Sequence, residues 1–145
     1  MKTPWHLWVV GIVTLLWNAV GAFDYLMARL QNPSYLAMIP EADRAGYMAY
    51  LGAMPVWAVS GWAFGVWGSV LGSLLILFRS RHAFAAIVVS LAGLAVTSVY
   101  TFFLAPPSDL MTADLGSVAF TAGIVAVQLA MLSYIRRQTA AGVLR

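Results

Sequence analysis

Few side chains in this 145-residue sequence could bind a polar ligand, and most of them lie inside long apolar runs. The candidates are one amide, one carboxylate, two aromatic residues and two threonines, namely Asn18, Asp24, Trp62, Tyr100, Thr97 and Thr121. If each run is a helix that rises about 1.5 Å per residue from its basic end, Asn18, Thr97 and Thr121 share a depth of about 20 Å. Asp24 and Tyr100 then lie about 25 to 28 Å from that end. This spacing predicts a polar, ligand-binding vestibule in one half of a helical bundle. Trp62 is a candidate for its wall, and packing against the glycines of the bundle is the simpler interpretation of this residue.

Asn18 and Asp24 carry most of this prediction, because amides and carboxylates are costly to place in hydrocarbon. We expect Asp24 either to bind a polar or cationic solute or to pair with Arg29, and an ordinary surface carboxylate is the alternative. The hydroxyl groups have a simpler interpretation, since Ser and Thr in membrane helices often bond to their own backbone. Gln128, about 10 Å from the basic end of the last run, is expected to contact a neighbouring helix rather than a ligand.

The sequence shows no apparatus for catalysis. It contains no nucleophile beside a base, no pair of carboxylates on one run and no glycine-rich phosphate loop. The absence of cysteine excludes disulfides and thiolate metal sites. His6 and His82 lack the close spacing and further ligands that a metal needs. We therefore expect no enzymatic activity, no metal and no other cofactor.

The elements that must position these residues are four apolar runs. The chain is 62% hydrophobic and only 9% charged, so lipid is a more suitable solvent for its surface than water. Runs of about 20 apolar residues are long enough to cross a bilayer as helices. The sequence predicts a single all-α transmembrane domain over residues 1–145, a four-helix bundle with spans at about 5–26, 55–78, 83–104 and 115–135.

Charged residues are sorted along the chain and predict its orientation. All five acidic residues lie around the first and third connections, at Asp24, Glu41, Asp43, Asp109 and Asp114. Six of the eight basic residues lie in the second connection or near the two ends. Because Lys and Arg are retained in the cytoplasm during insertion, we expect a multi-pass protein of the bacterial inner membrane with both termini cytoplasmic. The positive charge is expected to contact anionic lipid, and not nucleic acid.

The connections and the C-terminal tail also give expectations. Pro40, Glu41 and Asp43 favour a short helix at about 40–51. Its apolar side, with Tyr47 and Tyr50, suits the headgroup layer, so we expect an interfacial helix over the outer side. Residues 108–114 are expected to form an acidic outer loop, and the tail after Arg137 is expected to fray.

Four glycines in the second run are spaced by four, three and four residues, at Gly61, Gly65, Gly68 and Gly72. This spacing puts them on one helical face, where another backbone can approach closely. Packing inside the bundle is the favoured interpretation. A homodimer interface or a groove for a ligand is the alternative.

Residues 16–25, 39–41, 62–72 and 79–83 resemble corresponding segments of a group of short bacterial inner-membrane proteins with four spans, some of which carry the label "sugar transporter". The resemblance covers roughly the first two thirds of the chain. It implies transport activity, and it supplies no site residues.

Two functions from different classes fit these observations. The first is a small protein that binds or transports a small solute or lipid through a polar cavity in the outer half of the bundle. The alternative is a non-catalytic accessory or assembly subunit of a larger membrane complex. A cavity lined by Asn18, Asp24, Trp62 and Thr97 would favour the first, and a fully packed interior with an exposed small-residue face would favour the second.

Overall fold

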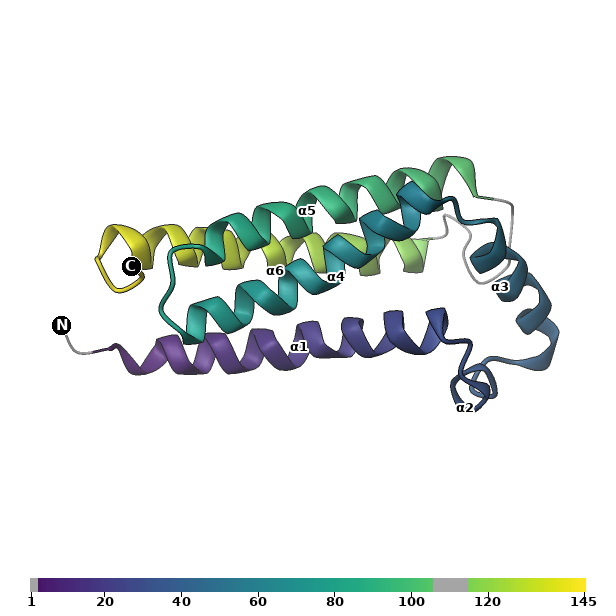
Figure 1. Cartoon of the computed structure of the whole chain (residues 1–145), viewed down its shortest axis with the longest axis horizontal. Coiled ribbons are helices and arrows are strands. Elements are labelled where there is room, and N and C mark those ends of the chain that lie inside the picture. Colours follow the sequence, from purple (N-terminus) through teal and green to yellow (C-terminus); the bar gives the residue numbers. More distant parts are fainter. Residues whose placement is uncertain (1–2, 106–114) are drawn as a thin grey trace.

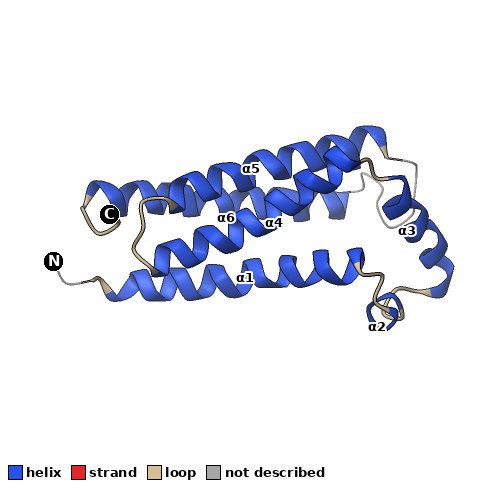
Figure 2. Cartoon of the chain, viewed as in Figure 1, coloured by secondary structure: helices blue, strands red, loops and turns tan. Residues whose placement is uncertain are grey.

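The computed structural model describes residues 3–105 and 115–145, and within these ranges the secondary structure is helical with no strand. The elements are α1 (Trp5–Arg29), α2 (Pro33–Leu36), α3 (Glu41–Ala53), α4 (Val56–Leu77), α5 (Ala83–Val99), the π-helical segment η1 (Tyr100–Leu104) and α6 (Leu115–Ala140). Figures 1 and 2 show the long helices side by side, with α2 and α3 at one end. The prediction of an all-α bundle is confirmed. The expected acidic loop at 108–114 lies outside the described residues.

Four of the described helices, α1, α4, α5 together with η1, and α6, are long and apolar enough to cross a membrane. This identifies the chain as a multi-pass membrane protein by the length and composition of its helices. The start of α1, the C-terminus and the α4–α5 turn lie at one end of the bundle, on the left of Figure 1, which we name the terminal end. The opposite end, which carries α2 and α3, is named the loop end.

Local sequence signals explain where the long helices begin and end. Pro4 and Pro55 precede the first residues of α1 and α4, where a missing backbone N–H and a fixed φ do no harm. Gln31 and Arg79 follow α1 and α4 with φ of 49° and 57°, the left-handed conformation that commonly terminates a helix. At Arg79 the turn is completed by a hydrogen bond from the Ser80 N–H to the Leu75 carbonyl, 2.8 Å long.

Helix α6 is longer than the predicted span, which ended at residue 135. It continues through Arg136 and Arg137 to Ala140, because arginine is a good helix former and a cation is favourable near a helix C-terminus. A basic pair therefore marks where the apolar stretch ends, and not where the helix ends.

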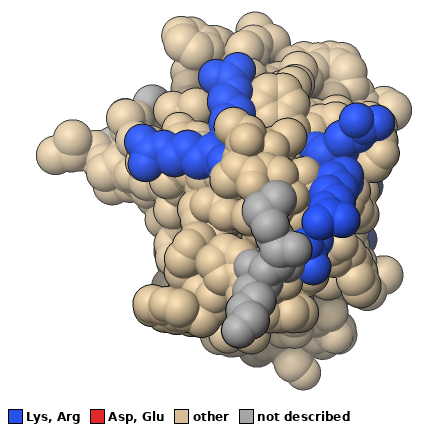
Figure 3. Space-filling view, turned by 90° about the vertical axis from the view of Figure 1, so that its left-hand side faces the viewer, with Lys and Arg blue, Asp and Glu red and all other residues tan. Residues whose placement is uncertain are grey.

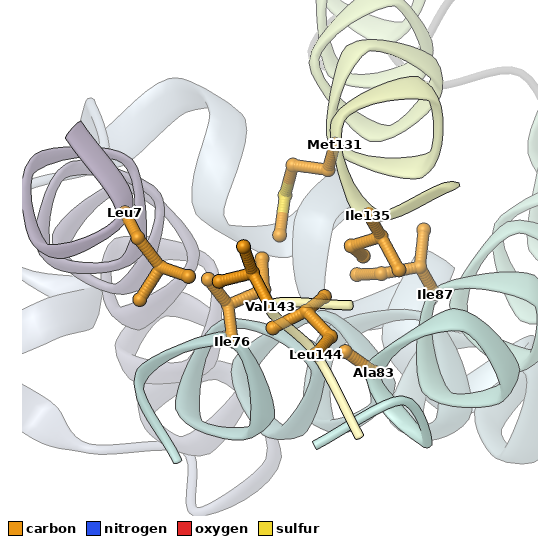
Figure 4. Packing of buried hydrophobic residues seen from close by; sticks show 8 residues of the cluster. All are labelled: Leu7, Ile76, Ala83, Ile87, Met131, Ile135, Val143 and Leu144. Atoms are coloured by element: carbon orange, nitrogen blue, oxygen red, sulfur yellow. The ribbon is translucent and has the colours of Figure 1, made fainter. Parts of the chain in front are cut away.

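The hydrophobic core consists of two separate clusters. At the terminal end, eight buried side chains from four helices and the tail pack together, as Figure 4 shows: Leu7, Ile76, Ala83, Ile87, Met131, Ile135, Val143 and Leu144. At the loop end, α3 packs against α1, α4 and η1 through Ala28, Tyr47, Tyr50, Leu51, Met54, Ala58 and Tyr100. The buried polar side chains of the described residues, Asn18, Ser69, Ser73, Ser90 and Gln128, lie on the long helices between these clusters.

The expectation of a frayed tail is wrong. Gly142, with φ of 68°, turns the chain back after α6, and Leu144 is only 2% exposed. The Arg81 N–H donates to the Arg145 carbonyl and the Arg145 N–H donates to the Arg79 carbonyl, each at 2.9 Å. The tail therefore fastens the end of α6 to the α4–α5 turn.

Helix α3 is present as predicted, but its tyrosine side faces the protein. Tyr47 and Tyr50 are 6% and 3% exposed, and the Tyr50 hydroxyl lies 2.9 Å from the Thr101 hydroxyl. The expectation that this side lies among lipid headgroups is therefore wrong, because burying it against the bundle removes more apolar surface from water.

Candidate functional site

The site is a cavity of about 430 Å³ between α1, α4, α5 and α6. Its apolar wall includes Trp17, Val20, Trp62, Leu94, Phe120 and Ile124, and its polar side chains are Asn18, Asp24, Ser69, Ser90, Thr97 and Gln128. The cavity thus occupies the part of the bundle between the two apolar clusters. A pocket with apolar walls and a few polar groups is the usual form of a small-molecule site.

The amide of Asn18 joins three helices at the floor of the cavity. Its Nδ2 donates to the Ser69 carbonyl at 3.2 Å and to the Ser73 hydroxyl at 3.0 Å, both on α4. From α6, the Gln128 Nε2 donates to the Asn18 Oδ1 at 3.5 Å. Asn18 and Gln128 are 5% and 2% exposed, so buried hydrogen bonds, and not apolar contacts alone, join the helices at the middle of the bundle.

The network also determines which way both amides point. A carbonyl oxygen can only accept a hydrogen bond, so the Ser69 carbonyl requires the NH₂ group of Asn18 to face it. The Asn18 oxygen then faces α6 and requires the NH₂ group of Gln128. This leaves the Gln128 Oε1 buried without a hydrogen-bond partner among the described residues. An unpaired buried acceptor is unfavourable by about 1 to 3 kcal/mol, and neighbouring atoms cover this one, so it does not open onto the cavity.

Asp24 lies on the cavity wall on the loop-end side of Asn18. The hydroxyl of Tyr35, on α2, donates to its Oδ1, and no ion pair with Arg29 forms within residues 3–105 and 115–145. Burial, together with the Asp24 carboxylate, raises the pKa of Tyr35 well above its usual value, so the hydroxyl keeps its proton. Tyr35 therefore orients Asp24 and leaves the second carboxylate oxygen for another partner.

Trp62 and Thr97 complete the wall on the side of α4 and α5. The Trp62 ring meets the Tyr25 ring edge-on at 4.9 Å between centroids, which holds the indole beside α1. The Thr97 hydroxyl donates to the Ala58 carbonyl at 3.2 Å. This hydrogen bond joins α5 to α4. The simpler interpretation of the hydroxyl groups, a bond from each one to the backbone of its own helix, therefore does not hold for Thr97.

The four glycines of α4 face α5 and let the two helices approach closely. A Cβ placed on Gly68 would lie 3.0 Å from the Ala86 carbonyl oxygen and the Ser90 nitrogen. Gly93 of α5 is the matching small residue, where a Cβ would lie 2.5 Å from the Gly61 oxygen and the Gly65 nitrogen. The glycine face is thus covered within the chain, which leaves it no room for a second copy.

The structure brings Asn18, Asp24, Trp62 and Thr97 onto one cavity wall, and it places two other candidates elsewhere. Tyr100 is 4% exposed in the loop-end cluster, where its ring lies 5.8 Å from the Tyr50 ring. Thr121 is half-buried on α6 and does not line the cavity.

One error in the predicted depths explains why Thr121 was counted among the ligand-binding candidates and Gln128 was not. Measured from the true end of α6 at Ala140, Gln128 lies at about 18 Å and Thr121 at about 28 Å. Asn18, about 20 Å from the start of α1, is therefore level with Gln128. The placement of Gln128 at about 10 Å is wrong, although the expected contact with a neighbouring helix is present.

Within the described ranges, no three His, Cys, Asp or Glu side chains gather as a metal site would require. The His6 Nδ1 lies 2.7 Å from the Tyr134 hydroxyl, so this histidine has a structural partner that joins α1 to α6 at the terminal end.

No protein-family model, curated protein or solved structure matches this chain. The fold and the cavity define it as a helical, multi-pass membrane protein with a ligand-sized internal pocket. The resemblance to short four-span bacterial proteins stays a prediction.

Proposed function

We propose that this protein binds a small, largely apolar molecule inside the membrane, and that it serves binding or transport without catalysing a reaction. The observation that carries the proposal is the cavity, whose volume of about 430 Å³ falls within the range of known small-molecule sites. A bundle with a purely structural role would gain stability by packing this space with side chains. The proposed setting is a bacterial inner membrane, with the terminal end in the cytoplasm.

The exposed part of the cavity wall suits a ligand arriving from lipid. At the terminal end, α1 and α6 are joined by His6 and Tyr134 and, further along, by Asn18 and Gln128. Towards the loop end the wall residues Val20 and Phe120 are 68% and 65% exposed. A molecule dissolved in the bilayer could therefore enter between α1 and α6 without crossing an aqueous phase.

Gly21 provides the sharpest test, because it lines the cavity and a Cβ there would meet no atom within 4 Å. Gly21→Phe should fill the pocket without disturbing the helices. After purification in mild detergent, mass spectrometry of the released small molecules should show a compound bound to the wild type and lost from this variant. Gly123→Phe is the matched control, since Gly123 also has open space but lies outside the cavity wall. Identical small-molecule profiles for all three proteins would contradict the proposal.

A second candidate function, an accessory subunit of a larger complex, is favoured by the outer surface of α6. Only 11% of its apolar stretch is buried, against 22% to 28% for the other three spans. Ala119, Gly123, Ala126 and Ala130 are all exposed and are spaced by four, three and four residues, as in helix–helix contacts in membranes. The same two variants distinguish the functions: an accessory role predicts that Gly123→Phe, and not Gly21→Phe, removes a protein subunit from the native mass of the complex.

A further inference from the structure

Most polar groups on the cavity wall already have hydrogen-bond partners. Three wall hydroxyls donate to backbone carbonyls: Ser69 to Val66 at 2.8 Å, Ser90 to Gly65 at 2.5 Å and Thr97 to Ala58 at 3.2 Å. The Asn18 NH₂ group is likewise occupied. The Gln128 Oε1 has no partner among the described residues, but neighbouring atoms cover it and it does not open onto the cavity. Asp24 is therefore the acceptor that a ligand can reach, and it requires a donor.

The charge of the wall favours a cation over an anion. Among the described residues that line the cavity, Asp24 is the charged one, and there is no Lys, Arg or His. Tyr35 engages one oxygen of Asp24 and leaves the other for a cationic donor, whose charge would strengthen the hydrogen bond. A phosphate or carboxylate would instead meet a negative charge with no cation to offset it.

Aromatic rings line the same cavity as Asp24. Trp17, Trp62 and Phe120 belong to the wall, and the faces of such rings attract ammonium groups while their area covers apolar carbon. A strongly hydrated cation without an apolar body would gain little from this wall. A cation that carries a hydrocarbon or aromatic group would use both properties.

Asp24 and the floor of the cavity lie at different depths, which sets the length of the ligand. Asp24 is about 9 Å along α1 from Asn18, and Asn18 contacts Gln128. We infer that the cavity is a site for a lipophilic amine, whose ammonium group binds Asp24 and whose apolar body extends towards the floor at Asn18 and Gln128. This inference rests on the proposed binding function and names the chemical class of its ligand.

Matched six-carbon probes test the charge preference. Binding of hexylamine, 1-hexanol and hexanoate is followed by intrinsic tryptophan fluorescence of the protein in nanodiscs of zwitterionic lipid, because Trp17 and Trp62 line the site. We expect hexylamine to bind about tenfold more tightly than 1-hexanol, and hexanoate to bind least. Asp24→Asn should remove this preference, so that hexylamine and 1-hexanol bind with equal affinity. The asparagine oxygen can still accept from Tyr35, so the variant keeps the local fold.

The controls separate failure of this inference from failure of the proposed function. Equal affinity of the wild type for hexylamine and 1-hexanol, with both lost in Gly21→Phe, would overturn the amine assignment and leave the binding site standing. The assignment is also overturned if no probe binds the wild type better than it binds Gly21→Phe. In that case the mass-spectrometric comparison alone decides whether the cavity binds another ligand.

Discussion

A single amide, that of Asn18, holds three membrane helices together, and its partner on α6 has an oxygen with nothing to accept. These two residues should therefore respond differently to removal of their polar groups. Asn18→Leu loses the bonds to Ser69, Ser73 and Gln128 and should lower the free energy of unfolding by about 1 to 2 kcal/mol. Gln128→Leu loses one bond of 3.5 Å but also removes an unpaired buried oxygen, so its effect should be below about 1 kcal/mol.

Unfolding of both variants by sodium dodecyl sulfate in mixed micelles, followed by far-ultraviolet circular dichroism, measures this difference. The double variant shows whether the two effects are coupled through the bond between the amides. A larger loss for Gln128→Leu than for Asn18→Leu would show that the buried oxygen of Gln128 has a hydrogen-bond partner.

Much of the site at the residue scale could be predicted from helix rise alone. Asn18 and Thr97 could be placed at one level because their helices begin near the predicted boundaries. Gln128 could not, because the boundary of α6 was taken from the basic pair and the helix extends beyond it. The contact between Tyr35 and Asp24 could not be predicted, because it depends on the chain reversing direction at Gln31. Gln31 has a positive φ, and the sequence gives no indication of this because glutamine seldom adopts that conformation.

At the scale of elements, the close contact of α4 with α5 is the rigid side of the cavity. Gly93 is its tightest point, since a Cβ there would lie 2.5 Å from backbone atoms of Gly61 and Gly65. Backbone cannot move aside as a side chain can, so Gly93→Ala should force the helices apart and destabilise the protein by about 1 to 3 kcal/mol. We expect the variant to show a lower midpoint of unfolding and an altered affinity for ligands of the cavity.

Gly123→Ala is the matched control for this prediction. It makes the same chemical change in the middle of a long helix, but with no atom within 4 Å of the new Cβ. Alanine is the better helix former by about 1 kcal/mol, so this variant should be unchanged or slightly more stable. Equal destabilisation by the two substitutions would mean that α4 and α5 are not in close contact at Gly93.

The sequence indicated the elements better than it indicated how they pack. The glycine spacing on α4 was visible, and Gly93 on α5 was missed because a single glycine has no periodicity to draw attention to it. For α3, Pro40, Glu41 and Asp43 correctly predicted a helix, and Tyr47 and Tyr50 gave it an apolar side. The same pattern suits a protein core and a lipid interface equally well, so only tertiary structure could decide which one it faces.

At the scale of the whole molecule, charge and packing follow one axis. Arg79, Arg81 and Arg145 lie at the terminal end, and Figure 3 shows that face with basic side chains and without visible acidic ones. Glu41 and Asp43 lie in α3 at the loop end. The two apolar clusters are nearest these ends, and the polar layer with the cavity lies between them. The bundle therefore has the asymmetry that a fixed orientation in a membrane requires.

That orientation can be tested with single cysteines, because the natural chain contains none. Ala42→Cys and His82→Cys place a thiol at exposed positions in α3 and in the α4–α5 turn, and neither changes an acidic or arginine residue. If arginine at the terminal end sets the topology, a membrane-impermeant maleimide should label Ala42→Cys in intact cells. It should label His82→Cys only after permeabilisation, and the unmodified chain should give no signal.

Labelling of both from outside would place the two ends of α4 on one side of the membrane, which is incompatible with α4 as a span and with a cavity inside the bilayer. The reverse pattern would keep the bundle but show that the arginines do not determine its orientation.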